Sequence, residues 1–361
     1  MKNWIKRAPG VCFGIMTIIA FLLILFTMVV FGWHTMLLNN EESLLRNTGY
    51  WSQKDVGEYK LNTYVTGNRV AGHKIIGISG MGIDDYPIGM YFVNNELKTD
   101  NLLVYIDRAG YGVSEDTTTP QTVERVVEDY RQVLIDMRIE GPYVLMPHSL
   151  GSVYATYWAM KYPDEIEAVV YIDGTTVIED AIEESNIKVK KEQNLIELGQ
   201  LGFYRLSSEA YIDKLPSNYP SSEIEASAAA QLRNVASMAK LSESVERNNN
   251  IRKTIEIITP TETPKLYISS SLGFTTREEV KQYFEWEYNK AVKVSYTDER
   301  ADKFIAQCAE YKASTIDVFV EAIGNTEIVM LPGDHCIYLE RPTELANIIK
   351  DFLHKLPNEE T

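Results

Sequence analysis

The chain has 361 residues, of which 45% are hydrophobic and 24% are charged, and its formal net charge is −16. This length suits one large globular domain with additions, or two domains, and the composition is that of a folded protein. A surface this acidic repels phosphate backbones, so the sequence argues against nucleic-acid binding.

The first predicted element is a membrane-spanning helix. The run from Val11 to Trp33 carries no formal charge and as a helix would span about 35 Å, enough for a hydrocarbon core of about 30 Å. Basic residues precede it up to Arg7, and the next one is Arg46. The positive-inside bias therefore predicts residues 1–38 as a cytoplasmic N-terminus and anchor in the cell membrane, with the rest extracellular. A cleaved signal peptide is the alternative, but its apolar region is only about 7–15 residues long.

After a polar connector at residues 39–57, apolar strands alternate with amphipathic helices. The clearest helix, at 120–138, places a row of valines on one face. Such alternation predicts an α/β fold, with a doubly wound, mostly parallel sheet and helices on both faces. The expected strands are 59–65, 73–79, 101–107, 142–146, 167–173, 264–270 and 326–332, and further helices are expected at 150–161 and 342–356.

The alternation stops between residues 175 and 262, where strand signals are weak and Glu, Lys, Asn and Ser are frequent. We expect several helices here, inserted as a cap over the strand ends. The predicted organisation is therefore a core in two parts, 58–174 and 263–357, separated by the helical cap 175–262.

Residues suited to hydrolysis follow three of the predicted strands. Ser149 follows strand 142–146, Asp173 ends strand 167–173, and His335 follows strand 326–332. Ligands of open parallel sheets gather beyond the carboxyl ends of the strands. A serine, an acid and a histidine from three strand ends therefore predict a hydrolase site.

Four motifs lie at the carboxyl ends of predicted strands: "ISGMG" (78–82), "DRAGYGVSE" (107–115), "PHSLGS" (147–152) and "LPGDHCIYLERPTEL" (331–345). Together they resemble the α/β-hydrolase superfamily over residues 58–174 and 262–356, in the order Ser, acid, His. Within that superfamily the chain resembles bacterial membrane-anchored serine hydrolases and esterases. The resemblance implies an α/β-hydrolase fold and makes "PHSLGS" the nucleophile elbow.

On this resemblance Ser149 is the nucleophile, although a helix N-cap serine is the structural alternative. Pro147 stands where the elbow usually has its first glycine. His335 is the general base, because the other histidines border the membrane, precede a strand, adjoin the serine or lie in the last helix. Those four are His34, His73, His148 and His354.

The acid and the oxyanion hole complete the predicted site. Asp173 is the expected acid, and Glu278 is the alternative because the superfamily more often places its acid after the strand at 264–270. The backbone N–H groups of Met81 and Leu150 are the expected oxyanion donors.

The resulting prediction is a serine hydrolase that cleaves an acyl bond, a carboxylic ester by resemblance, without metal or organic cofactor. A peptidase of the same fold acting on short peptides and a catalytically inactive binding module are the alternatives. The expected partners are a small acyl substrate and the lipid bilayer. Cys12, Cys308 and Cys336 have no zinc-site spacing, and we expect unpaired thiols in preference to a Cys308–Cys336 disulfide.

Overall fold

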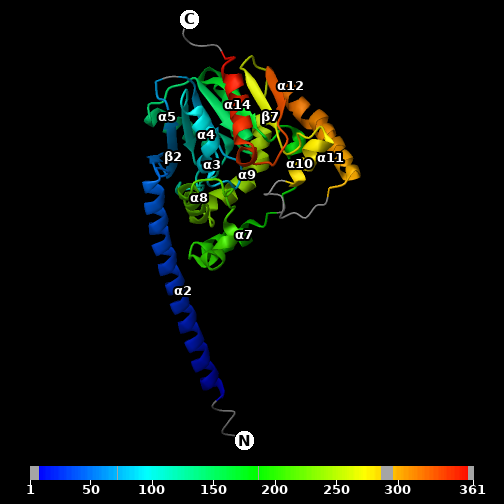
Figure 1. Ribbon diagram of the computed structural model, residues 1–361. Coiled ribbons are helices and arrows are strands. Elements are labelled where there is room, and N and C mark those ends of the chain that lie inside the picture. Colours follow the sequence, from blue (N-terminus) through cyan, green and yellow to red (C-terminus); the bar gives the residue numbers. More distant parts are fainter. Residues whose placement is uncertain (1–7, 71, 186, 286–295, 357–361) are drawn as a thin grey trace.

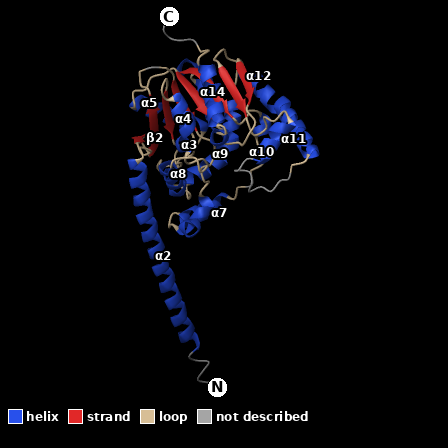
Figure 2. Ribbon diagram, in the orientation of Figure 1, coloured by secondary structure: helices blue, strands red, loops and turns tan. Residues whose placement is uncertain are grey.

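A single sheet forms the centre of the computed structural model, which describes residues 8–70, 72–185, 187–285 and 296–356 (Figure 2). Its strand order is β1-β2-β4-β3-β5-β6-β7-β8. Strand β2 runs antiparallel to both neighbours, and the other pairs are parallel. The predicted α/β class with a mostly parallel sheet is thus confirmed. The strands are β1 (Gln53–Asp55), β2 (Lys60–Gly67), β3 (Lys74–Ile78), β4 (Leu102–Ile106), β5 (Tyr143–Pro147), β6 (Ile166–Ile172), β7 (Lys265–Ser269) and β8 (Thr326–Met330).

Helices pack on both faces of this sheet, because successive side chains of the buried strands point to opposite faces. Ile76 of β3 joins the core beneath α5, α6 and α12, whereas Ile75 joins the core beneath α3, α4 and α14. Figure 1 shows α4 and α14 side by side over one face. These helices are α3 (Tyr86–Gly89), α4 (Tyr91–Leu97), α5 (Val123–Asp136), α6 (Gly151–Lys161), α12 (Asp317–Ile323) and α14 (Pro342–Leu353).

Helix α2 (Ala8–Asn47) is the one helix in the described part of the chain that is long and apolar enough to cross a membrane. It projects from the domain as a single rod (Figure 1). It also continues beyond the predicted anchor end at residue 38, so the expected connector 39–57 holds its last turns and strand β1. Leu45 in those turns is fully buried against the domain.

The segment between β6 and β7, which we call the cap segment (175–262), contains helices joined by loops and no strand among its described residues. It lies on the side of the sheet from which α2 projects (Figure 1). The cap elements are η2 (Glu179–Ala181), α7 (Val189–Gly199), η3 (Phe203–Tyr211), α8 (Ser221–Arg233) and α9 (Met238–Ile255). The remaining elements are η1 (Pro163–Glu165), α10 (Arg277–Glu285), α11 (Asp298–Tyr311), η5 (Lys312–Ile316) and α13 (Ile337–Glu340).

Candidate active site

A sharp turn between β5 and α6 carries Ser149. Its backbone φ is +49°, in the left-handed region that residues other than glycine rarely adopt. A Cβ on Gly151 would lie 2.5 Å from the carbonyl oxygen of Ile78, so only glycine lets α6 start this close to β3. The turn leaves Ser149 partly exposed while its neighbours His148 and Leu150 are buried. This is the strand–turn–helix context in which a nucleophile elbow presents its hydroxyl.

Asp173 and His335 are in direct contact. The carboxylate Oδ2 of Asp173 lies 2.7 Å from His335 Nδ1 and also accepts the Ser271 hydroxyl at 2.6 Å. The other oxygen, Oδ1, accepts the backbone N–H of Ser270 at 2.7 Å. An ionised carboxylate can only accept hydrogen bonds, so the neutral His335 ring must carry its proton on Nδ1, which faces Asp173. Its Nε2 then has a free lone pair and can act as a base.

The pairing shifts the pKa of both groups. Partial burial alone would lower the pKa of His335, but the hydrogen bond and negative charge of Asp173 outweigh it and raise the pKa above 6.5. Burial would raise the pKa of Asp173, but His335 and the serine donors outweigh burial and lower it. Asp173 is therefore held as a carboxylate beside a histidine that readily accepts a proton.

His148 joins the elbow to the loop that carries His335. Its Nε2 donates to the backbone oxygen of His335 at 2.9 Å, and the two rings lie 4.6 Å apart. Burial and the charge of His335 lower the pKa of His148 to about 3, so its ring stays neutral. Within the described residues no hydrogen bond joins the Ser149 hydroxyl to His335. Such bonds are often long in substrate-free enzymes and shorten in the substrate complex.

The loop after β3 lies against the elbow. A Cβ on Gly80 would come within 2.9 Å of the Ser149 Cβ. Neither the Met81 nor the Leu150 backbone N–H has a protein acceptor among the described residues. The N–H of Gly82 is already used, because it donates to the Tyr111 hydroxyl at 3.0 Å. Met81 and Leu150 thus retain the free donors that an oxyanion hole needs.

Arg108 holds this loop from behind, through partners that the sequence did not predict. Its guanidinium donates to the carbonyl oxygens of Ser79 at 2.6 Å and Gly80 at 2.8 Å. Its Nε lies 2.6 Å from Glu243 of helix α9, and both side chains are almost fully buried. The only sequence signal was the "DRAGYG" run after β4, which does not reveal a partner 135 residues away.

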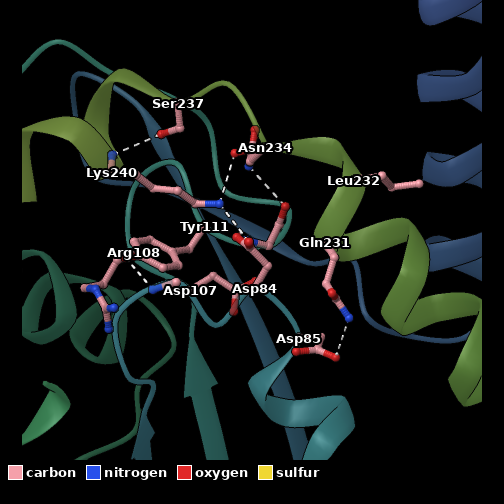
Figure 3. Close-up of polar contacts among 12 residues, drawn as sticks. Asp84, Asp85, Asp107, Arg108, Tyr111, Gln231, Leu232, Asn234, Ser237 and Lys240 are labelled. Carbon is pink, nitrogen blue, oxygen red and sulfur yellow. Dashed lines mark hydrogen bonds and ion pairs between the residues drawn. The ribbon is translucent and has the colours of Figure 1, made fainter. Parts of the chain in front are cut away.

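Further polar contacts tie the cap segment to the same turn (Figure 3). The Lys240 ammonium lies 2.7 Å from Asp84 and also donates to the Asn234 carbonyl at 3.0 Å. The Asn234 amide in turn donates to the carbonyl oxygen of Gly112. Helices α8 and α9 are thereby anchored to the loops that surround the elbow.

Glu278, the alternative acid, does not face the histidine. It is exposed on α10 and accepts a hydrogen bond from Gln282, one turn along the same helix. The carboxylate that contacts His335 is that of Asp173. Of the two predicted acids, the structure therefore brings Asp173 to the histidine.

A cavity of about 290 Å³ opens beside the His335–Asp173 pair. Its other walls come from the loop after β6, from Arg247 of α9 and from residues near α11. The lining includes hydroxyls as well as charged groups, so the space suits a small polar ligand. Its lining residues include Thr175, Thr176, Asp180, Glu183, Arg247 and Tyr311.

Among the described residues, no group of three or more His, Cys, Asp or Glu side chains is placed to hold a metal ion. Cys308 is buried, Cys336 is half-buried, and both thiols are unpaired.

Three comparisons place the chain among known proteins. No protein-family model matches it. It is 27% identical over 342 residues to the uncharacterized protein YbdG of Bacillus subtilis, covering 94% of this chain and 95% of that one. Its structure is similar to an epoxide hydrolase from Vigna radiata, with a TM-score of 0.58 and 15% identity over 84% of this chain and 97% of that one. A membrane phospholipase A is similar at a TM-score of 0.53 and 15% identity, over 93% and 96%. The fold of the chain is therefore that of the α/β-hydrolases.

Proposed function

We propose that this α/β-hydrolase-fold protein is a membrane-anchored serine hydrolase that cleaves a carboxylic ester through an acyl-enzyme on Ser149. The observation that carries the proposal is the His335–Asp173 contact at the carboxyl edge of the sheet, beside an elbow serine with a φ of +49°. The esters and related bonds cut by proteins of this fold vary widely, so the fold alone does not select the reaction.

The chemistry follows from the roles of three side chains. His335 Nε2 takes the hydroxyl proton of Ser149 while the Ser149 oxygen attacks the acyl carbonyl. His335 then gives this proton to the leaving alkoxide. Asp173 holds the ring with the proton on Nδ1 and stabilises the imidazolium that forms. A water molecule, activated by His335, then releases the acid and restores the serine.

The charge that develops on the carbonyl oxygen would be held by the N–H groups of Met81 and Leu150. Each such donor typically stabilises the transition state by about 2.7–4 kcal/mol. Arg108 supports this step indirectly, because its contacts with Ser79 and Gly80 hold the loop that presents Met81.

Purified full-length protein in detergent should be tested on matched acyl esters and aminoacyl amides. We expect hydrolysis of esters, and loss of that hydrolysis in Ser149→Ala and His335→Ala while both variants keep the wild-type circular dichroism. Preference for the amides would support the peptidase alternative and contradict the ester proposal. Ester hydrolysis that survives in His335→Ala would refute the assigned base.

A catalytically inactive binding module is the second candidate, because no hydrogen bond joins Ser149 to His335 in the described residues. Absence of any Ser149-dependent turnover across the substrate panel would favour it.

The anchor proposal has its own test. We propose that α2 spans the cell membrane with its N-terminus in the cytoplasm, supported by its length and by the basic residues directly before its apolar run, with no Lys or Arg after that run until Arg46. Protease added outside intact cells should digest the domain, and complete protection would contradict this orientation.

A further inference from the structure

Helix α2 packs against the cap segment at the depth of its apolar run. The ring centroids of Phe26 in α2 and Phe203 in η3 lie 6.2 Å apart, and those of His34 and Tyr204 lie 5.6 Å apart. Gly202, with a φ of +89°, sits so close that a Cβ there would be 2.4 Å from the His34 Cβ. Part of the cap segment therefore lies beside the apolar rod and not above it (Figure 1).

Buried polar contacts lock this arrangement in place. Arg205 of η3 is almost fully buried and forms a two-point ion pair with Glu41 of α2, one arm of which measures 2.9 Å. Its Nε also lies 3.3 Å from His34 Nδ1. Arg233 of α8 donates to the carbonyl oxygen of Leu38 at 2.9 Å. A bidentate arginine with so little exposure specifies one geometry between helix and cap.

The position of Phe26 sets the depth of this contact in a bilayer. No charged residue occurs between Arg7 and Glu41, which leaves residues 8–40 for the span. A hydrocarbon core takes about 20 helical residues. Every 20-residue window within 8–40 contains residues 21–27, so Phe26 lies in hydrocarbon wherever the span is placed. Phe203, in contact with Phe26, must then lie at the level of the membrane.

The surface around Phe203 has the side chains that such a position requires. On α7 and η3, which together form what we call the α7–η3 surface (189–211), several large apolar side chains are exposed. Leu198 is 54% and Leu206 58% exposed, and α7 begins beside an exposed Lys188. Clustered exposed apolar side chains are uncommon on soluble surfaces, and flanking lysines suit anionic headgroups. The exposed large apolar side chains of this surface are Val189, Leu195, Leu198, Leu206 and Tyr211; Lys190 and Lys191 are exposed at its start, and Lys188 immediately precedes it.

We propose that the α7–η3 surface is a second membrane contact, which lies beside α2 in the headgroup region of the outer leaflet. The proposal rests on the anchor role proposed for α2. Glu197 and Glu209 are also exposed on this surface, so the segment lies at headgroup depth and only its leucines and aromatic rings reach toward the acyl chains. Because Glu243 and Lys240 of the same cap segment contact the loops around Ser149, this contact orients the candidate active site toward the bilayer.

The test measures the depth of single fluorophores in the full chain reconstituted into phosphatidylcholine and phosphatidylglycerol vesicles. Cys12, Cys308 and Cys336 are first replaced by serine. An environment-sensitive dye is then attached through Leu198→Cys or Leu206→Cys. Leu23→Cys in α2 serves as the lipid reference and Ile135→Cys on α5, 63% exposed, as the aqueous reference.

We expect blue-shifted emission at positions 198 and 206, with quenching by nitroxide-labelled lipid as at position 23 and weak quenching by aqueous iodide. Position 135 should show the reverse. Arg205→Met should lower the lipid quenching at position 206 and leave position 23 unchanged, because the lock to Glu41 is lost.

The outcomes separate this proposal from the anchor on which it rests. Aqueous behaviour at both 198 and 206 with lipid quenching at 23 would refute the second contact and leave the anchor intact. Aqueous behaviour at 23 as well would refute both. Protection from iodide without lipid quenching at 198 and 206 would assign the surface to a second copy of the chain and overturn the proposal.

Discussion

Nε of Arg108 lies 2.6 Å from the carboxylate of Glu243, and each side chain is no more than 2% exposed. The contact is an ion pair without hydrogen-bond geometry, since this Nε–H has no hydrogen-bond partner. It connects the loop that would present the oxyanion donors to helix α9 of the cap segment. This buried pair of charges is therefore one of the contacts that couple the position of the cap segment to the geometry of the site.

Removing one partner of this pair should destabilise the protein. Glu243→Gln leaves the buried Arg108 without a counter-charge, and breaking a buried pair in this way typically costs about 3–5 kcal/mol. The measurement is the free energy of unfolding by urea in detergent. The matched control is Glu246→Gln, one turn along α9, whose carboxylate accepts a hydrogen bond from the nearby Asn249. Equal stability of the two variants would show that the pair contributes nothing.

Asp173→Asn should lower kcat by a factor on the order of 10⁴, because the amide NH2 can donate to Nδ1 and favour the wrong tautomer of His335, and the amide carries no charge to stabilise the imidazolium. The fold should survive, since the substitution keeps the shape of the side chain, and circular dichroism checks this. Glu278→Gln is the control and should hydrolyse esters at the wild-type rate. The reverse result, with loss only in Glu278→Gln, would transfer the role of the acid to Glu278.

The pH dependence of kcat/KM should report the raised pKa of His335. The reaction needs the neutral imidazole, so activity should be low when His335 is protonated and should rise as the pH passes through a pKa above 6.5. Asp334 also raises this pKa, by its charge. Asp334→Asn should therefore move the rise to lower pH. A rise centred below pH 6.5 in the wild type would contradict the His335–Asp173 pairing.

The same pairing contributes to stability in a defined pH range. A histidine whose pKa is higher in the folded state stabilises the protein fully below about pH 6.5, its unfolded value. That contribution disappears as the pH rises through the folded pKa of His335. The difference in unfolding free energy between wild type and His335→Gln should shrink over this range, and a difference that grows with pH would contradict the sign.

His148 is expected to be a positioning residue, because its ring N–H donates to the backbone oxygen of His335 and not to the imidazole that takes the proton. His148→Phe removes this donor, and a small displacement of a catalytic group can cost about 10²-fold in rate. We expect kcat to fall with KM nearly unchanged, and His148→Gln, which keeps an N–H donor, to recover part of the loss. Wild-type kcat in His148→Phe would exclude a positioning role.

The sequence predicted the parts of this molecule that follow from local patterns. Alternating apolar runs located the parallel strands, and the strand ends led to Ser149, Asp173 and His335. Strand β1 was missed because "QKD" has no apolar side chain and pairs only at the edge. The last turns of α2 were predicted to be part of a connector, because they follow the apolar run and are mostly polar. Their polar side chains face the cap segment and solvent. Contacts between distant segments, such as Arg205 with Glu41, leave no local signal.

The most direct test of the central claim is the reaction of the full-length protein with a fluorophosphonate, followed by peptide mass spectrometry. A serine activated by His335 should take up one phosphonyl group on the peptide that contains Ser149, and Ser149→Ala should take up none. An unmodified Ser149 in folded wild-type protein, or equal labelling of Ser149→Ala, would contradict the proposed nucleophile.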